Sequence, residues 1–353
     1  MACHLGDHHP GGVAGPCQQA QASIHDSLLN LVINMINMKD FLKGSGFIQP
    51  IWVFVIVITI FFSFMSEYFL SIGNLSNILV QTSTIGLIAL GMTYVMINGN
   101  IDLSVGAVLG LSASLSVGLQ DYGITIAVIA ALASGLVLGA INGLVVWKTG
   151  VNAFIVTLGA MIGVRGLIFV YTEEQSFYAT NFAFSDFGTA SIGPFPVLAL
   201  IFLICTLVMH LVLKKTGHGR NTFAVGGNPE AALDAGIRIG RHMMINFIIV
   251  GFFAALAGVL LATQMGAATP NLGRDYELWT ITAVVLGGTK LTGGYGSITG
   301  TLGGVLAIGI LRNGMNLMQV PAFYVLVILG VILISVLIID QRLNVHASKG
   351  VSI

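Results

Sequence analysis

Apolar runs long enough to cross a bilayer alternate with short polar segments along almost the whole chain. A window of about 19 residues, the length that spans the hydrocarbon core, predicts about ten transmembrane helices. The chain is therefore predicted to be an all-α membrane protein. The predicted spans are roughly 48–66, 78–98, 101–119, 123–146, 153–172, 195–213, 243–264, 278–290, 296–315 and 322–339.

Two of these spans look irregular. The third begins directly after the break Gly99-Asn100-Ile101-Asp102, and the eighth is short. Half-spans and broken helices are tolerated in a membrane only where protein or a cavity covers the backbone. We expect such breaks near 98–104 and 287–296.

A polar loop, residues 214–242, separates two apolar runs and contains a short predicted helix with residues typical of both a helix start and a helix end. Asn228 is a good N-cap, Pro229 suits the first helical position, and Gly236 is placed to end the helix in a left-handed conformation. A helix of about two turns is too short to fold as a domain. Such a helix is suited to bind another protein.

Basic residues fall on one side of the predicted spans. With the N-terminus inside, eleven of the fourteen Lys and Arg residues collect in inside segments, which predicts both termini in the cytoplasm. The exceptions are Arg165, Arg274 and Arg312. The inside group is Lys39, Lys43, Lys148, Lys214, Lys215, Arg220, Arg238, Arg241, Lys290, Arg342 and Lys349.

Composition supports a lipid-solvated chain: 56% of residues are hydrophobic and 8% are charged, against roughly 25% charged in soluble proteins. The 45 glycines suit closely packed membrane helices. Zero formal net charge argues against a nucleic-acid partner. The three cysteines lack zinc-site spacing, so we expect neither a metal site nor a disulfide framework.

The chain divides by composition into three parts. Residues 1–44 form a polar tail that we expect to be disordered; a metal site in it is the alternative. Met35 and Met38 are alternative natural starts. Residues 45–340 form the membrane domain, and 341–353 a cytoplasmic tail. The metal alternative would use Cys3, His4, His8 and His9.

Motifs for hydrolysis are missing from the sequence. The glycine-rich stretch 287–294 has Lys290 in the wrong register for a phosphate-binding loop. Neither a His-Glu-x-x-His nor a Gly-x-Ser-x-Gly motif occurs. We therefore predict no catalytic residues and no cofactor. Acidic residues inside spans, which proton-driven carriers use, are also scarce, with Asp102 the one candidate.

Neutral polar residues inside the spans suit a path for a hydroxyl-rich solute, and hydrogen bonds between helices are the alternative. Arg165 lies about 12 residues into its span, roughly 18 Å deep. We favour a role for it in supporting a broken helix by donating to freed carbonyls. The residues predicted for the path or for helix-break support are Asn98, Asn100, Asp102, Ser104, Thr157 and Arg165.

Eight stretches of the chain form a recognisable set of motifs: Ile88–Thr93, Gly99–Gly106, Ala153–Gly159, Arg165-Gly166, Ala224–Ala232, Ala283–Thr289, Gly294–Thr301 and Leu311–Gly314. They resemble the permease subunits of bacterial ABC importers for monosaccharides, the ribose, arabinose, xylose and galactoside group. The resemblance covers about 45–340, and the Ile101–Gly106 element resembles the sugar branch in particular.

The resemblance implies a type II importer fold in the bacterial inner membrane. Its partners would be a cytoplasmic ATPase that binds ATP, a periplasmic sugar-binding protein and a second permease, identical or a sister chain. The loop 214–242 would then couple to the ATPase. The coupling residues implied are Asn228, Pro229, Glu230, Ala231, Ala232, Asp234 and Gly236.

Charged residues on the outer side are candidates for docking the binding protein: Arg274, Glu277 and Arg312. The alternative for Arg274 is a local pair with Asp275 or Glu277. Two other functions stay open, the same fold importing nucleosides or amino acids, and a stand-alone carrier or channel. The sequence does not name the sugar.

Overall fold

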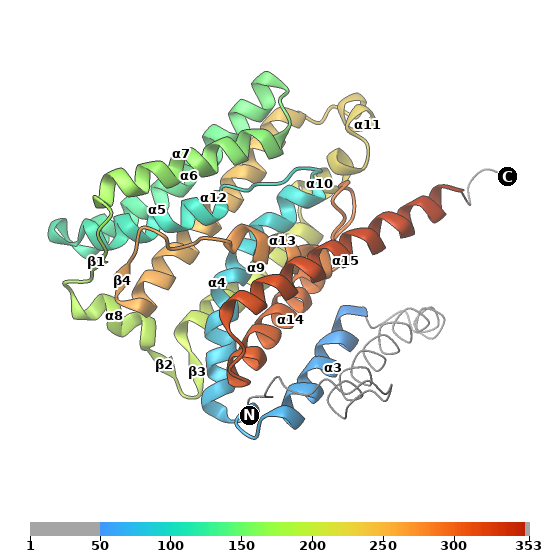
Figure 1. Ribbon diagram of the computed structural model, residues 1–353. Helices are drawn as coiled ribbons and strands as arrows, with labels where there is room; N and C mark the ends of the chain where they lie inside the picture. Colours follow the sequence, from blue (N-terminus) through green and yellow to red (C-terminus); the bar gives the residue numbers. More distant parts are fainter. Residues whose placement is uncertain (1–49, 350–353) are drawn as a thin grey trace, which may run out of the picture. The chain divides into compact units, whose positions relative to one another are not determined.

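The computed structural model describes residues 50–349, and the chain divides near residue 50 into two units, of which the second is considered below. Each of the ten predicted spans contains a helix (Figure 1). The all-α membrane fold is thus confirmed. These helices are α3 Pro50–Met65, α4 Ile72–Ile97, α5 Val105–Gly118, α6 Ile124–Thr149, α7 Ala153–Thr172, α9 Val197–Lys215, α12 Ile239–Met265, α13 Tyr276–Leu286, α14 Ile298–Leu317 and α15 Ala322–Lys349.

The remaining elements lie in the connections. Two antiparallel pairs of two-residue strands form there, β1 with β4 through Phe177 and Ala268, and β2 with β3 through Ser191 and Pro196. Three further helices are α8, α10 and α11. A short 3-10 helix, η1, is also present. The bounds of all the connecting elements are η1 Gln120–Tyr122, β1 Phe177–Tyr178, α8 Phe182–Thr189, β2 Ser191–Ile192, β3 Phe195–Pro196, α10 Gly217–Gly227, α11 Pro229–Asp234 and β4 Ala267–Ala268.

Helix length separates ordinary spans from irregular ones. Five described helices, α4, α6, α7, α9 and α12, are long and apolar enough to cross a membrane. Shorter apolar helices include α5 and α13, which have 14 and 11 residues. At 1.5 Å per residue neither reaches across a core of roughly 30 Å alone.

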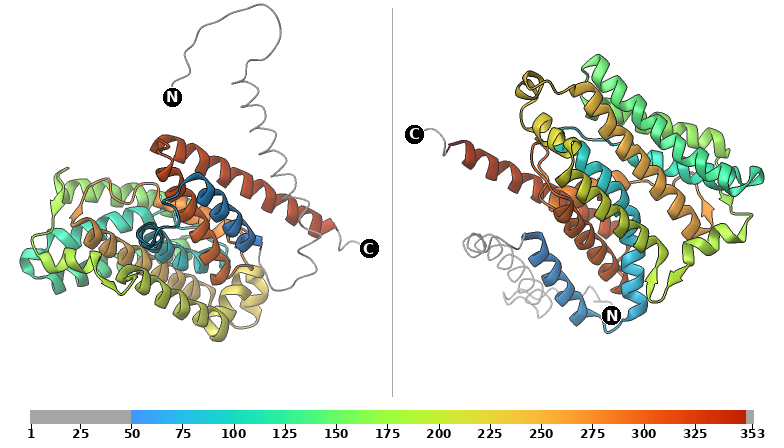
Figure 2. Two further views of the ribbon diagram at one scale, coloured as in Figure 1. Left: turned by 90° about the horizontal axis from the view of Figure 1, so that it is seen from below. Right: turned by 180° about the vertical axis from the view of Figure 1, so that it is seen from behind.

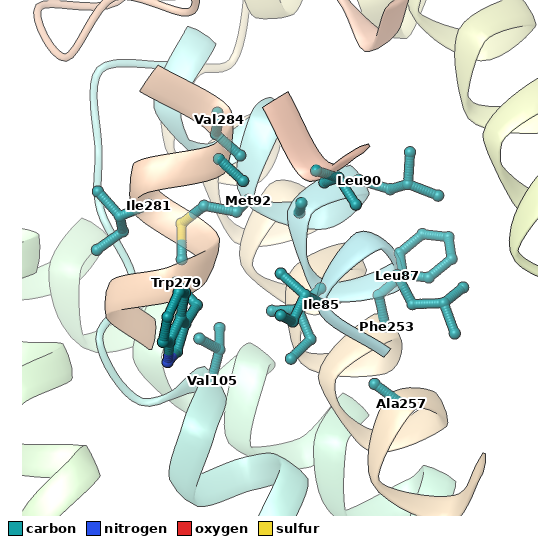
Figure 3. Packing of buried hydrophobic residues seen from close by; sticks show 14 of the residues in the cluster. Ile85, Leu87, Leu90, Met92, Val105, Phe253, Ala257, Trp279, Ile281 and Val284 are labelled. Carbon is teal, nitrogen blue, oxygen red and sulfur yellow. The ribbon is translucent and has the colours of Figure 1, made fainter. Parts of the chain in front are cut away.

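The helices α4 and α12 form the inside of the bundle. In the most apolar window of each, 83% and 67% of residues are buried, against 22% in both α6 and α7. Figure 3 shows Leu87 and Met92 of α4 in the same cluster as Phe253 of α12 and Trp279 of α13. Since α4 is surrounded by protein, its sequence carries no lipid-facing stripe.

Small residues let α6 and α12 approach closely. Gly135, Gly139 and Gly143 recur every fourth residue on the buried face of α6. A methyl group at Gly135 would overlap the carbonyl of Gly251 on α12. Such stripes drive helix association in membranes, where apolar burial gives no preference for protein over lipid.

The predicted N-terminal and C-terminal tails lie at the two ends of the described residues. The tail 1–44, with its metal alternative and the alternative starts, lies outside them. At the other end α15 continues through residue 340 as far as Lys349. Most of the predicted C-terminal tail therefore continues the last helix. The views in Figure 2 show α15 extending beyond the neighbouring helix ends.

Candidate functional site

Two broken spans lie side by side in the bundle. The first consists of non-helical residues 98–104 followed by α5, and the second of non-helical residues 266–275, apart from the two-residue β4, followed by α13. Gly106 at the start of α5 lies against Gly273 and Glu277, so the two half-helices begin beside each other. In Figure 3 Val105 and Trp279, near these two starts, are drawn close together.

The helix α5 lies along the non-helical part of the second span, and the loop after α13 reaches the non-helical part of the first. Gly110, one turn further along α5, contacts the carbonyl of Leu272, while Gly99 lies against Gly293 beyond the end of α13. The two chains therefore run in opposite directions. Their helix N-termini, each carrying partial positive charge, meet in the middle of the pair.

Side chains close the first break at 98–104. The Asp102 carboxylate accepts hydrogen bonds from the Ser104 amide at 2.8 Å and from the Ser104 hydroxyl at 2.6 Å. Asn142 of α6 donates to that hydroxyl at 2.9 Å, and the Thr157 hydroxyl donates to the Ile101 carbonyl at 3.3 Å. Three of the predicted residues thus hold the break together.

Arg165 reaches the second break from α7. Its Nη1 donates to the carbonyl oxygen of Leu272 at 2.7 Å, across 107 residues of sequence. Leu272 lies in the non-helical segment 266–275, where carbonyls lack helical partners. The sequence prediction placed the second break at 287–296, which the structure shows as non-helical, and missed 266–275. Pro270 and Gly273, both turn-forming residues, could have indicated it.

Asn98 and Glu277 are buried without full pairing. Among residues 50–349, Nδ2 and Oδ1 of Asn98 have no hydrogen-bond partner, and Oε2 of Glu277 has none either. Glu277 is 8% exposed and packs against Gly106. It lies inside the bundle, unlike the outer-surface position that the sequence suggested, because α5 covers it. We therefore leave Glu277 out of the docking set.

The other two docking candidates are more accessible. Arg274 is exposed, and Arg312 is half-buried with its guanidinium 5.7 Å from the centre of the Trp279 ring. Stacking on an aromatic ring holds a cation without removing its charge. Arg274 thus lies just before α13, and Arg312 lies near the end of α14.

The polar loop contains two short helices where the sequence predicted one. In α11 the Asn228 side chain accepts from the Ala231 amide at 3.0 Å, and Gly236 takes a φ of +81°, as its predicted capping roles require. Ala232 is buried against the bundle, whereas Leu233 is 61% exposed. Leu233 was not among the coupling residues that the sequence analysis named. Glu230, Ala231 and Asp234 are exposed beside it.

A polar cluster beneath this loop ties α10 to the bundle. Nε2 of His218 lies 2.9 Å from Oδ1 of Asn246, and Nε2 of His242 lies 3.0 Å from the Thr222 hydroxyl. The two imidazole rings are 4.4 Å apart, and the Tyr94 ring of α4 stacks on His218. Burial lowers the pKa of His218 below its ordinary value of 6.5, partly opposed by the bond to Asn246. The sequence marked these histidines only as part of a polar stretch.

A pocket of about 440 Å³ opens beside the first break. Gly99, Asn100 and Ile101 line it together with Asn152, at the start of α7, and Met243 of α12. Among the predicted path residues Asn100 lines this pocket, whereas Asp102, Ser104 and Thr157 are buried in the helix contacts described above.

Fold and site together define a multi-pass helical membrane permease, with paired broken spans inside the bundle and an exposed polar loop. The chain belongs to the family described as branched-chain amino acid transport system / permease component, whose model matches residues 74–337. This confirms the resemblance seen in the sequence motifs.

Curated relatives cover most of the chain. It is 41% identical over 311 residues to the ribose import permease protein of Bacillus subtilis (strain 168), covering 87% of this chain and 95% of the relative. It is 37% identical to the D-allose transport system permease protein of Escherichia coli (strain K12), covering 83% and 91%. The galactose/methyl galactoside import permease protein of the same strain is 33% identical, covering 88% and 98%. No solved structure matches the chain.

Proposed function

We propose that this chain is the membrane-spanning permease subunit of an ATP-driven importer for a monosaccharide. The observation that carries the proposal is α11, a capped helix with exposed residues that is suited to docking a partner. The three relatives named above are permeases for ribose, D-allose and galactose or methyl galactoside, which supports a sugar as substrate.

In this proposal α11 docks a cytoplasmic ATPase, which binds the ATP. Leu233 would enter a pocket on that partner, and Ala231 would let the partner approach the helix backbone. Glu230 and Asp234 are four residues apart, so they project on one side and can meet basic groups. Asn228, Pro229 and Gly236 hold the helix in shape, and Ala232 seats it on the bundle.

The proposed orientation puts both termini in the cytoplasm of a bacterium and the chain in its inner membrane. The excess of Lys and Arg in the segments assigned to the inside supports it. Labelling intact cells with a membrane-impermeant thiol reagent tests it. Cysteine at exposed Asp186 should react and cysteine at exposed Arg220 should not. The reverse pattern contradicts this orientation.

On the outer face Arg274 and Arg312 would meet acidic residues of a periplasmic sugar-binding protein. The exposure of Arg274 and the position of Arg312 near the end of α14 support this pairing. The contacts of Asp102, Ser104, Thr157 and Arg165 favour support of the broken spans over direct contact with sugar. Asn100, beside the pocket, is the better candidate for the path, and Asn98 stays a candidate.

Reconstitution in liposomes tests the function. The chain alone, with its cognate ATPase, and with ATPase plus binding protein should be compared for uptake of D-ribose, D-allose, D-galactose and L-arabinose. We expect uptake of a sugar only in the complete system with ATP. Uptake by the chain alone would identify a stand-alone carrier, and uptake restricted to nucleosides or amino acids would overturn the sugar assignment.

The same preparation shows whether the second permease subunit is another copy of this chain or a sister chain. A complex with two copies of this chain indicates a homodimer, whereas activity that requires a sister chain indicates a heterodimer. The mass of the purified active complex distinguishes them.

A further inference from the structure

Three segments far apart in the sequence meet at one backbone oxygen, the carbonyl of Ile97 at the end of α4. The amide of Gly294 donates a hydrogen bond to it at 2.8 Å. Gly226, in the last turn of α10, lies against the same oxygen. A methyl group at Gly226 would overlap the Ile97 carbonyl and come within 2.7 Å of the Gly294 nitrogen.

The meeting point joins α10 to one end of each broken span. Ile97 directly precedes the break at 98–104, and Gly294 lies in the loop that follows α13. The same loop reaches Gly99, because a Cβ at Gly293 would lie 2.9 Å from the Gly99 nitrogen and 2.8 Å from the Gly226 carbonyl. We call Gly99, Gly226, Gly293 and Gly294 the glycine joint.

Backbone geometry requires glycine at three of these positions. The φ angles of Gly99, Gly293 and Gly294 are +80°, +86° and +73°, in the left-handed region that side chains disfavour. At Gly226 the reason is the close approach of Ile97 instead. No flexible side chain therefore separates α10 from the two loops, and a displacement of α10 is passed on through backbone contact.

We propose that Gly226 is the positioning residue through which movement of the α10–α11 unit reaches both broken spans. The inference rests on the proposed function, in which α11 docks an ATPase. The connection is short, since α10 ends at Gly227, one residue after Gly226, and α11 begins at Pro229, directly after its N-cap Asn228. One movement would then shift the two half-helices together.

The chain supplies a matched pair of variants. Gly226→Ala and Gly227→Ala both alter the last turn of α10 and share the same gain in helix propensity. A Cβ at Gly227 meets nothing within 4 Å, whereas at Gly226 it overlaps backbone atoms. A difference in transport between the two variants therefore measures the effect of crowding the glycine joint.

The first measurement is sugar taken up per ATP hydrolysed. It uses the reconstituted complex and a mixture of radiolabelled D-ribose, D-allose and D-galactose. We expect Gly226→Ala to lower this ratio on the order of tenfold and Gly227→Ala to leave it unchanged. Loss of folded complex would lower uptake and hydrolysis in proportion and leave the ratio constant. A normal ratio in Gly226→Ala overturns the inference, and so does an equal fall in Gly227→Ala.

The second measurement leaves the joint itself intact. Nitroxide labels on cysteines at the exposed positions Ala224 and Thr292 report the contact between α10 and the loop after α13. Their dipolar broadening should stay the same between nucleotide-free and ATP-trapped complexes. The broadening for a pair at Ala224 and Lys148 of α6 should change. A changed first pair, or an unchanged second pair, overturns the inference.

The wild-type complex separates this inference from the proposed function. Absence of ATP-dependent sugar uptake in the wild type removes the proposed function and the inference with it. Normal wild-type uptake with a normal ratio in Gly226→Ala removes the inference alone.

Discussion

The paired broken spans and the polar loop 214–242 solve the same physical problem by opposite means. Both contain helix ends whose backbone groups lack helical partners. In α11 the partners are local, as in the bond from the Ala231 amide to the Asn228 side chain, three residues apart. In the broken spans they come from distant helices, as in the bond from Arg165 to Leu272. A buried end inside a membrane has no water to replace a lost partner, whereas an exposed end does.

The largest expected effect comes from crowding the contact between the broken spans. Gly106→Val should destabilise the protein by about 3 kcal/mol, because its side chain overlaps the Gly273 carbonyl and Glu277. Gly159→Val on α7 is the control, since a Cβ there meets nothing within 4 Å. Thermal unfolding in detergent measures the difference. Equal midpoints for the two variants would show that the broken spans are not tightly packed.

Removing the distant donor should have the next largest effect. Arg165→Ala leaves the Leu272 carbonyl without its partner, which should cost about 2 kcal/mol. Arg274→Ala, which removes an exposed arginine nearby, is the control and should change the unfolding midpoint little. An Arg165→Ala protein with normal stability and an altered sugar preference would instead assign Arg165 to the path.

Removing the N-cap of α11 should have a smaller effect on stability, and the effect should be confined to that helix. Asn228→Ala should cost about 1 kcal/mol of helix stability, confined to α11. Insertion and overall unfolding should stay normal, while sugar-stimulated ATP hydrolysis in the reconstituted complex falls. Asn228→Asp, which keeps a capping oxygen, should restore hydrolysis. A fall in the unfolding midpoint as large as that of Arg165→Ala would remove the contrast between the two regions.

The smallest effect should come from acid. Since the pKa of His218 is lowered in the folded protein, the unfolded chain binds a proton near pH 6 that the folded chain does not. Below about pH 6.5 the contact of α10 with the bundle should therefore weaken, and above it the contact should be at full strength. Hydrogen exchange of α10 amides at pH 7.5 and 5.5, corrected for intrinsic rates, measures this.

His218→Gln is the control for the acid effect, because glutamine can bond to Asn246 but does not titrate. His242 remains in that variant, 4.4 Å from the replaced ring in the native protein, so a residual dependence is expected to be smaller. An undiminished pH dependence would assign the effect to another group.

What the sequence could predict follows the range of the interactions. The spans and α11 were found because hydropathy windows and caps depend on neighbouring residues. The break at 98–104 was found because Gly99, Asn100 and Asp102 interrupt an apolar run. The break at 266–275 was missed because Arg274 and Asp275 make that segment look like an ordinary outer loop.

The same argument explains the misplaced Glu277 and the missed histidines. Glu277 follows two charged residues, so its neighbourhood in sequence indicates a surface, and only the packing of α5 buries it. His218 and His242 find their partners 28 and 20 residues away. Such pairings between separate helices leave no periodic trace in the sequence.

The mutual covering of the broken spans has a consequence for the order of biosynthesis. Residues 98–106 emerge from the ribosome well before Gly273 and Glu277, which lie against Gly106 in the finished fold. Roughly 170 residues separate the two, which at 5–20 residues per second corresponds to roughly 10–30 s. During that interval the Ile97 carbonyl lacks the Gly294 amide that donates to it in the finished fold. A chain truncated before residue 266 should therefore be an early target for membrane proteases, whereas the full-length chain should be resistant.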